Sequence, residues 1–385
     1  MIGITGTKGK TTTAHLLAAV LTAAGRRVGC IGTNGAVWPG QRHTLGYTTP
    51  ESCDLQHILR DMADDGCDAC VMEVSSLGLK MDRVGGIEFD VGVFTNLSPD
   101  HIGPGEHASY AEYRAWKSVL FRRCKVGVVN ADDRETPAIL KGHSCRVVRY
   151  GIAAPADWLA LPGFTPRRTA DALATDFTVR LPGGRMADFT VPMPGAFSVQ
   201  DALAALAAAG VLGVPVAAMQ AGLRGAAVRG RCEVIPCPAP FTVVLDYAHN
   251  AAAAESVLTA LRAYHPRRLI TVFGGGRSRL RRTGMGEACA RLADLCIVTE
   301  DNSRGEPLED IFADIRAGMD RVQNGAACVE IPNRRDALLY ALGLGREGDI
   351  LAVLGKGHET TIDRDGRKVP FEDAAVVREY MERVK

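Results

Sequence analysis

The stretch Met1-Ile-Gly-Ile-Thr-Gly-Thr-Lys-Gly-Lys-Thr-Thr-Thr13 decides the fold of this chain. It opens with β-branched residues at Ile2 and Ile4, which predict a short strand, and continues into a glycine-rich turn. The apolar residues 14–24 that follow predict a helix. A strand, a tight turn and a helix in this order are typical of the start of an α/β domain.

The turn has the composition of a phosphate-binding loop. Gly6 and Gly9 allow backbone conformations in which successive N–H groups point into one concavity, at a helix N-terminus whose dipole favours anions. Lys10 can reach the outer phosphates of a nucleotide, and the Thr11 hydroxyl can hold Mg²⁺. The other loop residues expected at the nucleotide are Thr7, Lys8 and Thr12. The alternative is an ordinary strand-to-helix turn, because Ile4 stands where the usual first glycine of such loops would fall.

Composition excludes several other classes of function. The 385 residues are 46% hydrophobic and 23% charged with a net charge of +1, which gives no reason to expect nucleic acid or a membrane surface as partner. No apolar run approaches the roughly 20 residues that span a bilayer, and the phosphate loop stands where a signal peptide would be. Eleven cysteines without framework spacing predict reduced thiols in the cytoplasm.

Two α/β patterns follow one another along the chain. Strands predicted at residues 28–31, 69–74, 91–95 and 126–130 alternate with helices at 52–65 and 110–121, and a Gly/Asn-rich loop follows the strand at 28–31. This pattern predicts a doubly wound parallel sheet with its site at the carboxyl ends of the strands. Short alternating segments at 176–181 and 187–191 predict a small antiparallel appendage, and helices are expected over 194–210 and 216–223. Further strands at 242–246, 269–273, 295–299 and 349–353 predict a Rossmann-like second domain, so we expect an ATP-binding domain over 1–228 and a second domain over 229–385.

Polar residues at predicted strand ends are the candidate site. A carboxylate at Glu73 could complete magnesium coordination with Thr11, and His101 could be a second ligand or an ordinary loop histidine. Lys117 lies within a predicted helix, and the sequence alone predicts that it is solvated. In the second half Asp246 and His249 follow a strand, where an Asx-turn and a surface histidine are the alternative. Cations suited to carboxylates or phosphates gather there as well: Arg281, Arg282, Arg304 and Lys356. These residues indicate phosphoryl transfer between two domains, without separating a kinase from a ligase.

Eight motifs follow one another along the chain: Thr5-Gly-Thr-Lys-Gly-Lys-Thr-Thr-Thr13, Met72-Glu-Val-Ser-Ser-Leu-Gly-Leu79, Thr95-Asn-Leu-Ser-Pro-Asp-His101, Asn130-Ala-Asp-Asp133, Gly230-Arg-Cys-Glu233, Asp246-Tyr-Ala-His249, Asp301-Asn-Ser-Arg304 and Gly355-Lys-Gly-His-Glu359. Together and in this order they resemble the Mur ligase family, and within it the branch of UDP-N-acetylmuramoyl-tripeptide synthetases. The resemblance implies an ATP-dependent amide ligase in which a substrate carboxylate becomes an acyl phosphate and an amine then displaces phosphate. ATP and Mg²⁺ would be the cofactors, and a small carboxylate acceptor and an amino acid the substrates.

The same resemblance implies a role for individual residues. Lys10 would contact the β- and γ-phosphates, Thr11 and Glu73 would hold one Mg²⁺, and His101 a second. Lys117 would be the lysine that is carbamylated in the family and so becomes a metal ligand, which reverses its reading as solvated. Further nucleotide contacts are expected from Gly6, Gly9, Asn96, Ser198, Asp201, Arg231, Asp246 and His249. The acceptor would meet Thr48, Thr49, Ser75 and Arg83, and the incoming amino acid Arg282, Asp301, Asn302, Arg304, Gly355 and Glu359.

The sequence also departs from the family pattern. We expect it to lack the family's N-terminal UDP-binding domain, because the chain starts at the phosphate loop. Leu77 and Met81 replace a histidine and a glutamine, Ser303 replaces a proline, and Ser198 and Asp201 replace two asparagines. These departures favour a ligase with an altered acceptor. The alternatives are a subunit of a heteromeric ligase whose partner chain holds the acceptor, a folylpolyglutamate-synthetase-like ligase, or a non-catalytic nucleotide-binding protein.

Overall fold

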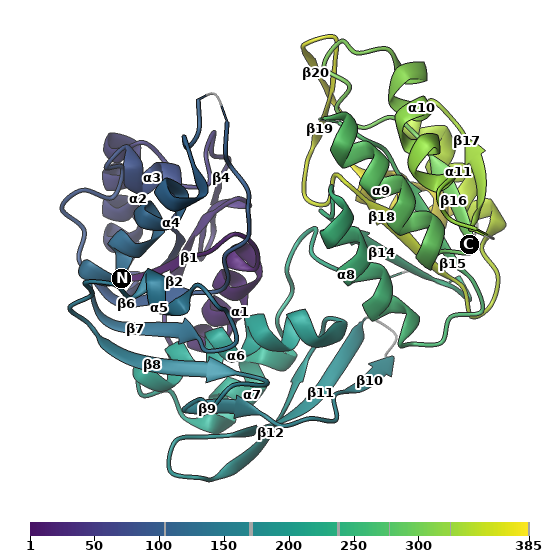
Figure 1. Cartoon of the computed structure of the whole chain (residues 1–385). Helices are drawn as coiled ribbons and strands as arrows, with labels where there is room; N and C mark the ends of the chain where they lie inside the picture. Colours follow the sequence, from purple (N-terminus) through teal and green to yellow (C-terminus); the bar gives the residue numbers. More distant parts are fainter. Residues whose placement is uncertain (104, 169–171, 237–238, 277, 324, 384–385) are drawn as a thin grey trace. The chain divides into compact units, whose positions relative to one another are not determined.

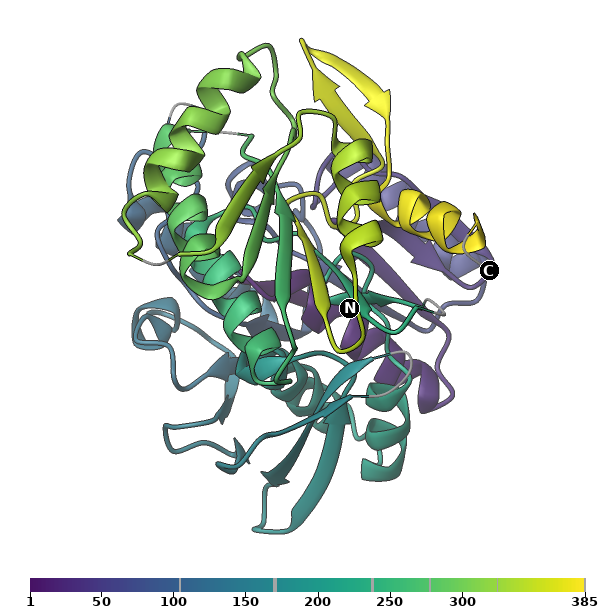
Figure 2. The same cartoon turned by 90° about the vertical axis from the view of Figure 1, so that its right-hand side faces the viewer.

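The computed structural model describes residues 1–103, 105–168, 172–236, 239–276, 278–323 and 325–383. The chain forms two compact units (Figures 1 and 2). The first unit contains residues 1–165, 175–192 and 196–228, and the second contains 166–174, 193–195 and 229–385. Among the described residues, no helix combines the length and the apolar character that a membrane crossing requires.

The sheet of the first unit is built around β1 (Ile2–Thr5). This strand is buried and pairs in parallel with β5 (Ala69–Glu73) on one side and β6 (Phe89–Phe94) on the other. Beyond β5 lies β2 (Val28–Gly32), and beyond β6 lie β7 (Cys124–Asn130), β8 (Arg146–Gly151) and β9 (Trp158–Ala160) (Figure 1). The carboxyl ends of β1, β5 and β6 therefore meet at one edge, which is where ligands bind in such sheets.

Helices cover both faces of this sheet because its central strands are apolar on both sides. One face carries α2 (Ser52–Asp64), α3 (Ser76–Lys80), α4 (Tyr110–Ser118), the 3₁₀ turn Val119–Arg122 and α5 (Thr136–Ile139), all contributing to one core cluster. The other helices of this unit are α1 (Lys10–Ala23), α6 (Gly195–Val211) and α7 (Val216–Arg224). Helix α1 packs so closely on α7 that a Cβ at Gly222 would lie 2.5 Å from the Val20 Cα.

The predicted parallel sheet and its antiparallel appendage are confirmed, and the differences are local. The appendage is formed by β11 (Leu173–Arg180) and β12 (Met186–Val191), with β10 at Thr165–Arg168. The Gly/Asn-rich segment predicted as a loop instead forms β3 (Gly35–Trp38) and β4 (Gln41–His43), an antiparallel extension of β2. Its turn depends on Gly35, whose φ of 97° a side chain would not tolerate. Helix α1 starts four residues before the predicted apolar stretch (14 − 10 = 4), because the loop turns at Gly9 and buries the three threonines that follow Lys10.

The second unit is a Rossmann-like sheet. Its parallel strands lie in the order β14 (Thr242–Asp246), β18 (Ile350–Leu354), β15 (Leu269–Phe273), β16 (Leu295–Val298) and β17 (Ala327–Glu330), with β13 (Glu233–Ile235) antiparallel at the edge. On one face lie α11 (Arg334–Leu344) and α12 (Asp373–Arg383), and on the other α8 (Ala251–Arg262), α9 (Arg279–Leu292) and α10 (Leu308–Met319) (Figure 2). A hairpin of β19 (Thr361–Arg364) and β20 (Arg367–Pro370) follows β18.

Candidate active site

The phosphate loop is held in shape by residues that follow β6. Gly6 has a φ of 151°, and a Cβ there would lie 1.9 Å from the Thr95 hydroxyl oxygen, so only glycine fits. The Thr95 hydroxyl donates to the Lys8 carbonyl at 2.6 Å. The Asn96 side chain accepts from the Lys8 amide at 3.0 Å and donates to its carbonyl at 3.1 Å. Asn96, predicted at the nucleotide, therefore braces the loop.

Two lysines converge on this loop. Lys10 Nζ donates to the Gly6 carbonyl at 2.9 Å and to the Thr7 carbonyl at 3.1 Å. Lys117 Nζ donates to the same Gly6 carbonyl at 2.8 Å. The prediction from the sequence alone that Lys117 is solvated is wrong, because the side chain is only 2% exposed. Burial, reinforced by the charge of Lys10, holds the pKa of Lys117 well below its ordinary value.

Glu73 is a buried carboxylate at the end of β5. The side chain is 2% exposed, and its two oxygens accept from the Thr33 amide at 2.8 Å and the Thr33 hydroxyl at 3.2 Å. It forms no ion pair within the part of the chain that the structure describes. A buried carboxylate without a cationic partner is costly, so this position fits a bound cation. Thr11, the hydroxyl predicted to share that cation, is buried in the first turn of α1.

The residues predicted at the acceptor come together beside Glu73. The Thr49 hydroxyl donates to the Glu73 carbonyl at 3.0 Å and accepts from the Ser75 amide at 2.9 Å. Arg83, 6% exposed, donates to the Thr49 carbonyl at 3.1 Å. The Thr48 hydroxyl lies 3.2 Å from that of Thr33, which contacts Glu73 directly. Arg83 also pairs with Glu51 at 2.5 Å, so a carboxylate ligand would have to compete for its guanidinium.

His101 is not gathered into a cluster of ligands. Its backbone is left-handed (φ 54°), and its Nδ1 lies 2.9 Å from Glu106 Oε1 at an exposed position. Within the described ranges, no group of three or more His, Cys, Asp and Glu side chains could hold a metal ion. A metal site in this unit would therefore also need hydroxyl, lysine-derived or phosphate ligands.

The remaining residues predicted at the nucleotide lie in both units. On α6, Ser198 is buried, and Asp201 lies so near the phosphate loop that a Cβ at Gly9 would be 2.2 Å from its Oδ1. In the second unit the Asp246 carboxylate accepts from the amides of Cys232 and Ala248 at 2.8 and 2.7 Å. Its burial raises its pKa. The bond from the Ala248 amide, two residues on, matches the Asx-turn alternative, and the nucleotide contact of Asp246 stays a prediction. His249 Nδ1 lies 2.8 Å from the Tyr247 carbonyl, and the Arg231 guanidinium lies 4.8 Å from the Tyr247 ring centroid.

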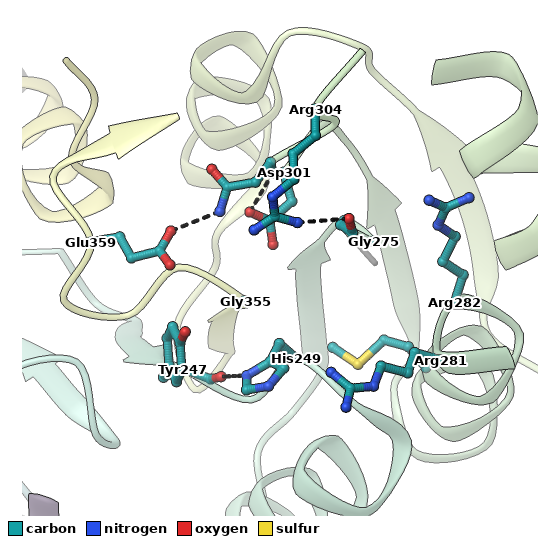
Figure 3. Close-up of a pocket in the computed structure, with 13 residues that line it drawn as sticks. Tyr247, His249, Gly275, Arg281, Arg282, Asp301, Arg304, Gly355 and Glu359 are labelled. Atoms are coloured by element: carbon teal, nitrogen blue, oxygen red, sulfur yellow. Dashed lines mark hydrogen bonds between the residues drawn. The ribbon is translucent and has the colours of Figure 1, made fainter. Parts of the chain in front are cut away.

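A pocket of about 110 Å³ opens at the strand ends of the second unit (Figure 3). Its lining includes His249 and every residue predicted for the incoming amino acid: Arg282, Asp301, Asn302, Arg304, Gly355 and Glu359. Lys356, fully buried beneath the pocket, donates to Glu359 at 2.9 Å and lies 4.0 Å from Asp301. Asn302 donates to the same Glu359 oxygen at 2.9 Å.

Two of the three arginines that line this pocket, Arg282 and Arg304, are held differently. Arg282 is 2% exposed and pairs with Glu306 and with Asp314, the latter at 3.2 Å, so its guanidinium is already engaged at the margin of the pocket (Figure 3). Arg304 is exposed, with a left-handed backbone (φ 53°), and donates to the Gly276 carbonyl at 3.0 Å. Arg304 is therefore the more accessible cation of the two.

Three residues of the site escaped the sequence interpretation. Thr33 supplies both hydrogen bonds to Glu73, and no local pattern marks it. The Tyr113 hydroxyl contacts Thr7 of the phosphate loop, and its ring contacts Lys117. The sequence feature that could have identified Tyr113 is its position one helical turn before Lys117. Tyr247 packs against His249 and His358, with ring centroids 4.7 and 5.0 Å apart.

Comparison with known proteins agrees with this geometry. Residues 4–209 match the Mur ligase middle domain, and residues 230–357 match the domain described as Mur ligase, glutamate ligase domain. The UDP-N-acetylmuramoyl-L-alanyl-D-glutamate--2,6-diaminopimelate ligase of Caldanaerobacter subterraneus subsp. tengcongensis is 36% identical over 390 residues, covering 99% of this chain and 78% of the relative. The enzyme of the same name from Alkaliphilus metalliredigens is 38% identical over 393 residues, covering 98% and 76%.

Solved structures show the same fold. A ligase of that name aligns with a TM-score of 0.71 and 30% identity over 100% of this chain and 78% of the other. A folylpolyglutamate synthase from Mycobacterium tuberculosis complexed with ADP aligns with a TM-score of 0.72 and 21% identity over 98% and 90%, a likeness of fold alone. Since both family domains and relatives above 30% identity cover nearly the whole chain, it belongs to the Mur ligase family and is an ATP-dependent, ADP-forming ligase.

Proposed function

We propose that this ligase activates a carboxylate acceptor as an acyl phosphate and joins it to the amine of an amino acid. A carboxylate oxygen attacks the γ-phosphorus of ATP, and the bond from that phosphorus to ADP breaks. The amine nitrogen then attacks the acyl carbon, the nitrogen loses a proton, and phosphate leaves as the amide forms. The observation that supports the proposal is a hydrogen-bond network around Glu73, the predicted cation ligand. Its carboxylate contacts Thr33, which contacts Thr48, and its carbonyl accepts from Thr49, so it adjoins two of the residues predicted at the acceptor.

Glu73 and Thr11 are the residues proposed to hold Mg²⁺. A buried carboxylate without a counter-ion and a buried hydroxyl at a helix start supply the oxygen ligands that this ion prefers. When bound, the ion would neutralise charge on the phosphoryl group in transfer. Lys10 would contribute a positive charge of its own from within the phosphate loop.

Lys117 is proposed to be carbamylated, with His101 as its companion ligand at a second metal. The supporting observation is its burial next to Lys10, which favours the neutral amine. A neutral amine can attack CO₂, forming a carbamate and releasing one proton. The modification would replace the lysine ammonium, which can only donate hydrogen bonds, by a carbamate whose oxygens can ligate a metal.

The pocket of the second unit is proposed to bind an amino acid with a charged group on its side chain. Arg304 offers a cation to a carboxylate, while Asp301 and Glu359, which lie 4.0 and 2.9 Å from Lys356, offer carboxylates to an ammonium. This arrangement supports an amino acid such as 2,6-diaminopimelate, which the names of the relatives contain. Ser303 in place of the family's proline leaves the neighbouring backbone less restrained.

The acceptor is proposed to differ from the usual muramoyl dipeptide. Leu77 stands next to Ser76 at the position of a family histidine. Met81, which replaces a family glutamine, is 59% exposed, and its sulfur lies 3.4 Å from the Arg83 guanidinium. A separate chain that holds the acceptor stays a prediction, without support from a contact or a relative.

The test is a screen for ADP and phosphate release with amino acids against carboxylate acceptors, including UDP-linked muramoyl dipeptide and folate-type glutamates. We expect release only when amine and acceptor are both present, and ¹⁸O from the acceptor carboxylate in the released phosphate. Lys10→Met is the inactive control. Full release without an acceptor, or phosphate free of ¹⁸O, would overturn the acyl-phosphate route. Turnover of a folate acceptor alone would favour the folylpolyglutamate alternative.

A further inference from the structure

Tyr113 lies at the meeting point of the phosphate loop and Lys117. Its side chain is fully buried, and its hydroxyl lies 3.0 Å from the Thr7 hydroxyl of the loop. Because Tyr113 and Lys117 are four residues apart on α4, they share a helix face, and Lys117 Nζ lies 4.6 Å from the Tyr113 ring centroid. That distance is within the range of a cation–π contact.

The hydroxyl of Tyr113 contacts the phosphate loop directly, and its ring is connected to the loop through Lys117. The hydroxyl reaches Thr7, whose own hydroxyl accepts from the Ser98 amide at 3.0 Å. The ring supports Lys117, which donates to Gly6. The centroid of the buried His107 ring lies 5.4 Å from that of Tyr113, so the two rings pack against each other.

Lys117 depends on this support. Among the described residues its Nζ makes the single hydrogen bond to Gly6 and no ion pair. A long side chain with one hydrogen bond is ordered mainly by the atoms packed along it, and the face of the Tyr113 ring supplies such packing. The ring and the hydroxyl of Tyr113 thus act on different parts of the site.

We propose that Tyr113 is a positioning residue with two separable parts: its hydroxyl fixes the phosphate loop through Thr7, and its ring fixes the side chain of Lys117. The inference rests on the proposed nucleotide site at this loop. Removing the hydroxyl should weaken nucleotide binding, whereas removing the ring should also slow the reaction.

The experiment compares Tyr113→Phe and Tyr113→Leu with Tyr110→Phe. Tyr110 lies on the same helix, and its hydroxyl reaches the Leu97 carbonyl at 3.5 Å instead of the loop, so it is a matched control. ADP affinity is measured by calorimetry without acceptor or amine, and kcat and KM by phosphate release. We expect Tyr113→Phe to weaken ADP binding about 3- to 10-fold with little change in kcat. Tyr113→Leu should lower kcat more than 10-fold in addition, and Tyr110→Phe should change neither.

A double-mutant cycle with Thr7→Val separates positioning from general stability. If the hydroxyl acts through Thr7, Tyr113→Phe has no further effect on ADP affinity in the Thr7→Val background. Additive losses, or ADP affinity unchanged in Tyr113→Phe, would overturn the inference. Failure of the unmodified protein to bind ADP would instead overturn the nucleotide site itself. Unfolding temperatures of all variants show whether a lost affinity merely follows lost stability.

Discussion

Lys10 and Lys117 donate to one acceptor, the carbonyl oxygen of Gly6, from 2.9 and 2.8 Å. Two like-charged groups on one oxygen repel each other, and the buried member of the pair has the lowered pKa. A bound anion such as a triphosphate would relieve this repulsion and favour the charged form of Lys117.

The first prediction concerns the cost of burying Lys117. Lys117→Met should raise the free energy of unfolding at neutral pH by on the order of 1 kcal/mol, since it removes a buried group that is costly to charge. The pKa of Lys117 is lowered in the folded state, so the unfolded chain binds more protons below the ordinary lysine pKa. The free energy of unfolding of the unmodified protein therefore rises with pH below the ordinary lysine pKa. The difference in this free energy between Lys117→Met and the unmodified protein shrinks toward pH 10.

Denaturant unfolding at several pH values, in buffer without nucleotide, metal or CO₂, measures this difference. Lys125→Met is the control, because Lys125 is exposed and pairs with Asp90 at 2.7 Å. A stability gap between Lys117→Met and the unmodified protein that stays constant from pH 7 to pH 10 would contradict the prediction.

The second prediction concerns the charge of Glu73. Glu73→Gln keeps an oxygen for the Thr33 amide but removes the buried negative charge. Without metal we expect the variant to be at least as stable as the unmodified protein, because the uncompensated charge is gone. With ADP, the extra rise in unfolding temperature that Mg²⁺ gives the unmodified protein should be lost. Glu88→Gln, at an exposed position, should retain it.

The third prediction distinguishes the roles of Arg282 and Arg304 in the pocket. Arg282→Lys should cost about 1–3 kcal/mol of stability, because lysine cannot reproduce the planar contacts with Glu306 and Asp314. Arg304→Lys should leave stability within about 0.5 kcal/mol, as for other exposed positions, and raise KM for the amino acid about 10-fold or more. Unfolding curves and steady-state kinetics distinguish the two; equal stability losses would show that Arg304 is structural as well.

The fourth prediction tests the space around Glu73 without changing the carboxylate. A Cβ at Gly32 would lie 2.2 Å from Glu73 Oε1, so Gly32→Ala should displace the carboxylate and weaken the stabilisation by Mg²⁺ and ADP. The matched control is Gly343→Ala in α11, where nothing lies within 4 Å. That control should gain about 0.5–1 kcal/mol from helix propensity and keep the Mg²⁺ effect. An unchanged Mg²⁺ effect in Gly32→Ala would place the ion elsewhere.

Several elements could be predicted from sequence because their signals are local. The strand over 269–273 matches β15 residue for residue, since a fully buried parallel strand is a continuous apolar run between breakers. The hairpin of β3 and β4 could not be predicted from sequence, because β4 is exposed throughout and its register depends on pairing with β3 and β2. The helix α3 is short, and its start depends on the Ser75 cap of the Gly78 amide.

The sequence by itself determined the succession of the central strands along the chain, the strand–turn–helix at its start and the polar residue types at the ends of those strands, because periodicity, glycine and charge act within a few residues. Only the tertiary structure decided which of these side chains are buried and what they contact. Lys117 illustrates the reason: its helix segment gives no sign of burial, yet its ammonium reaches a carbonyl 111 residues earlier in the chain. Burial, the pKa that follows from it and the partnership with Tyr113 and Lys10 arise from packing between distant segments, which no local pattern encodes.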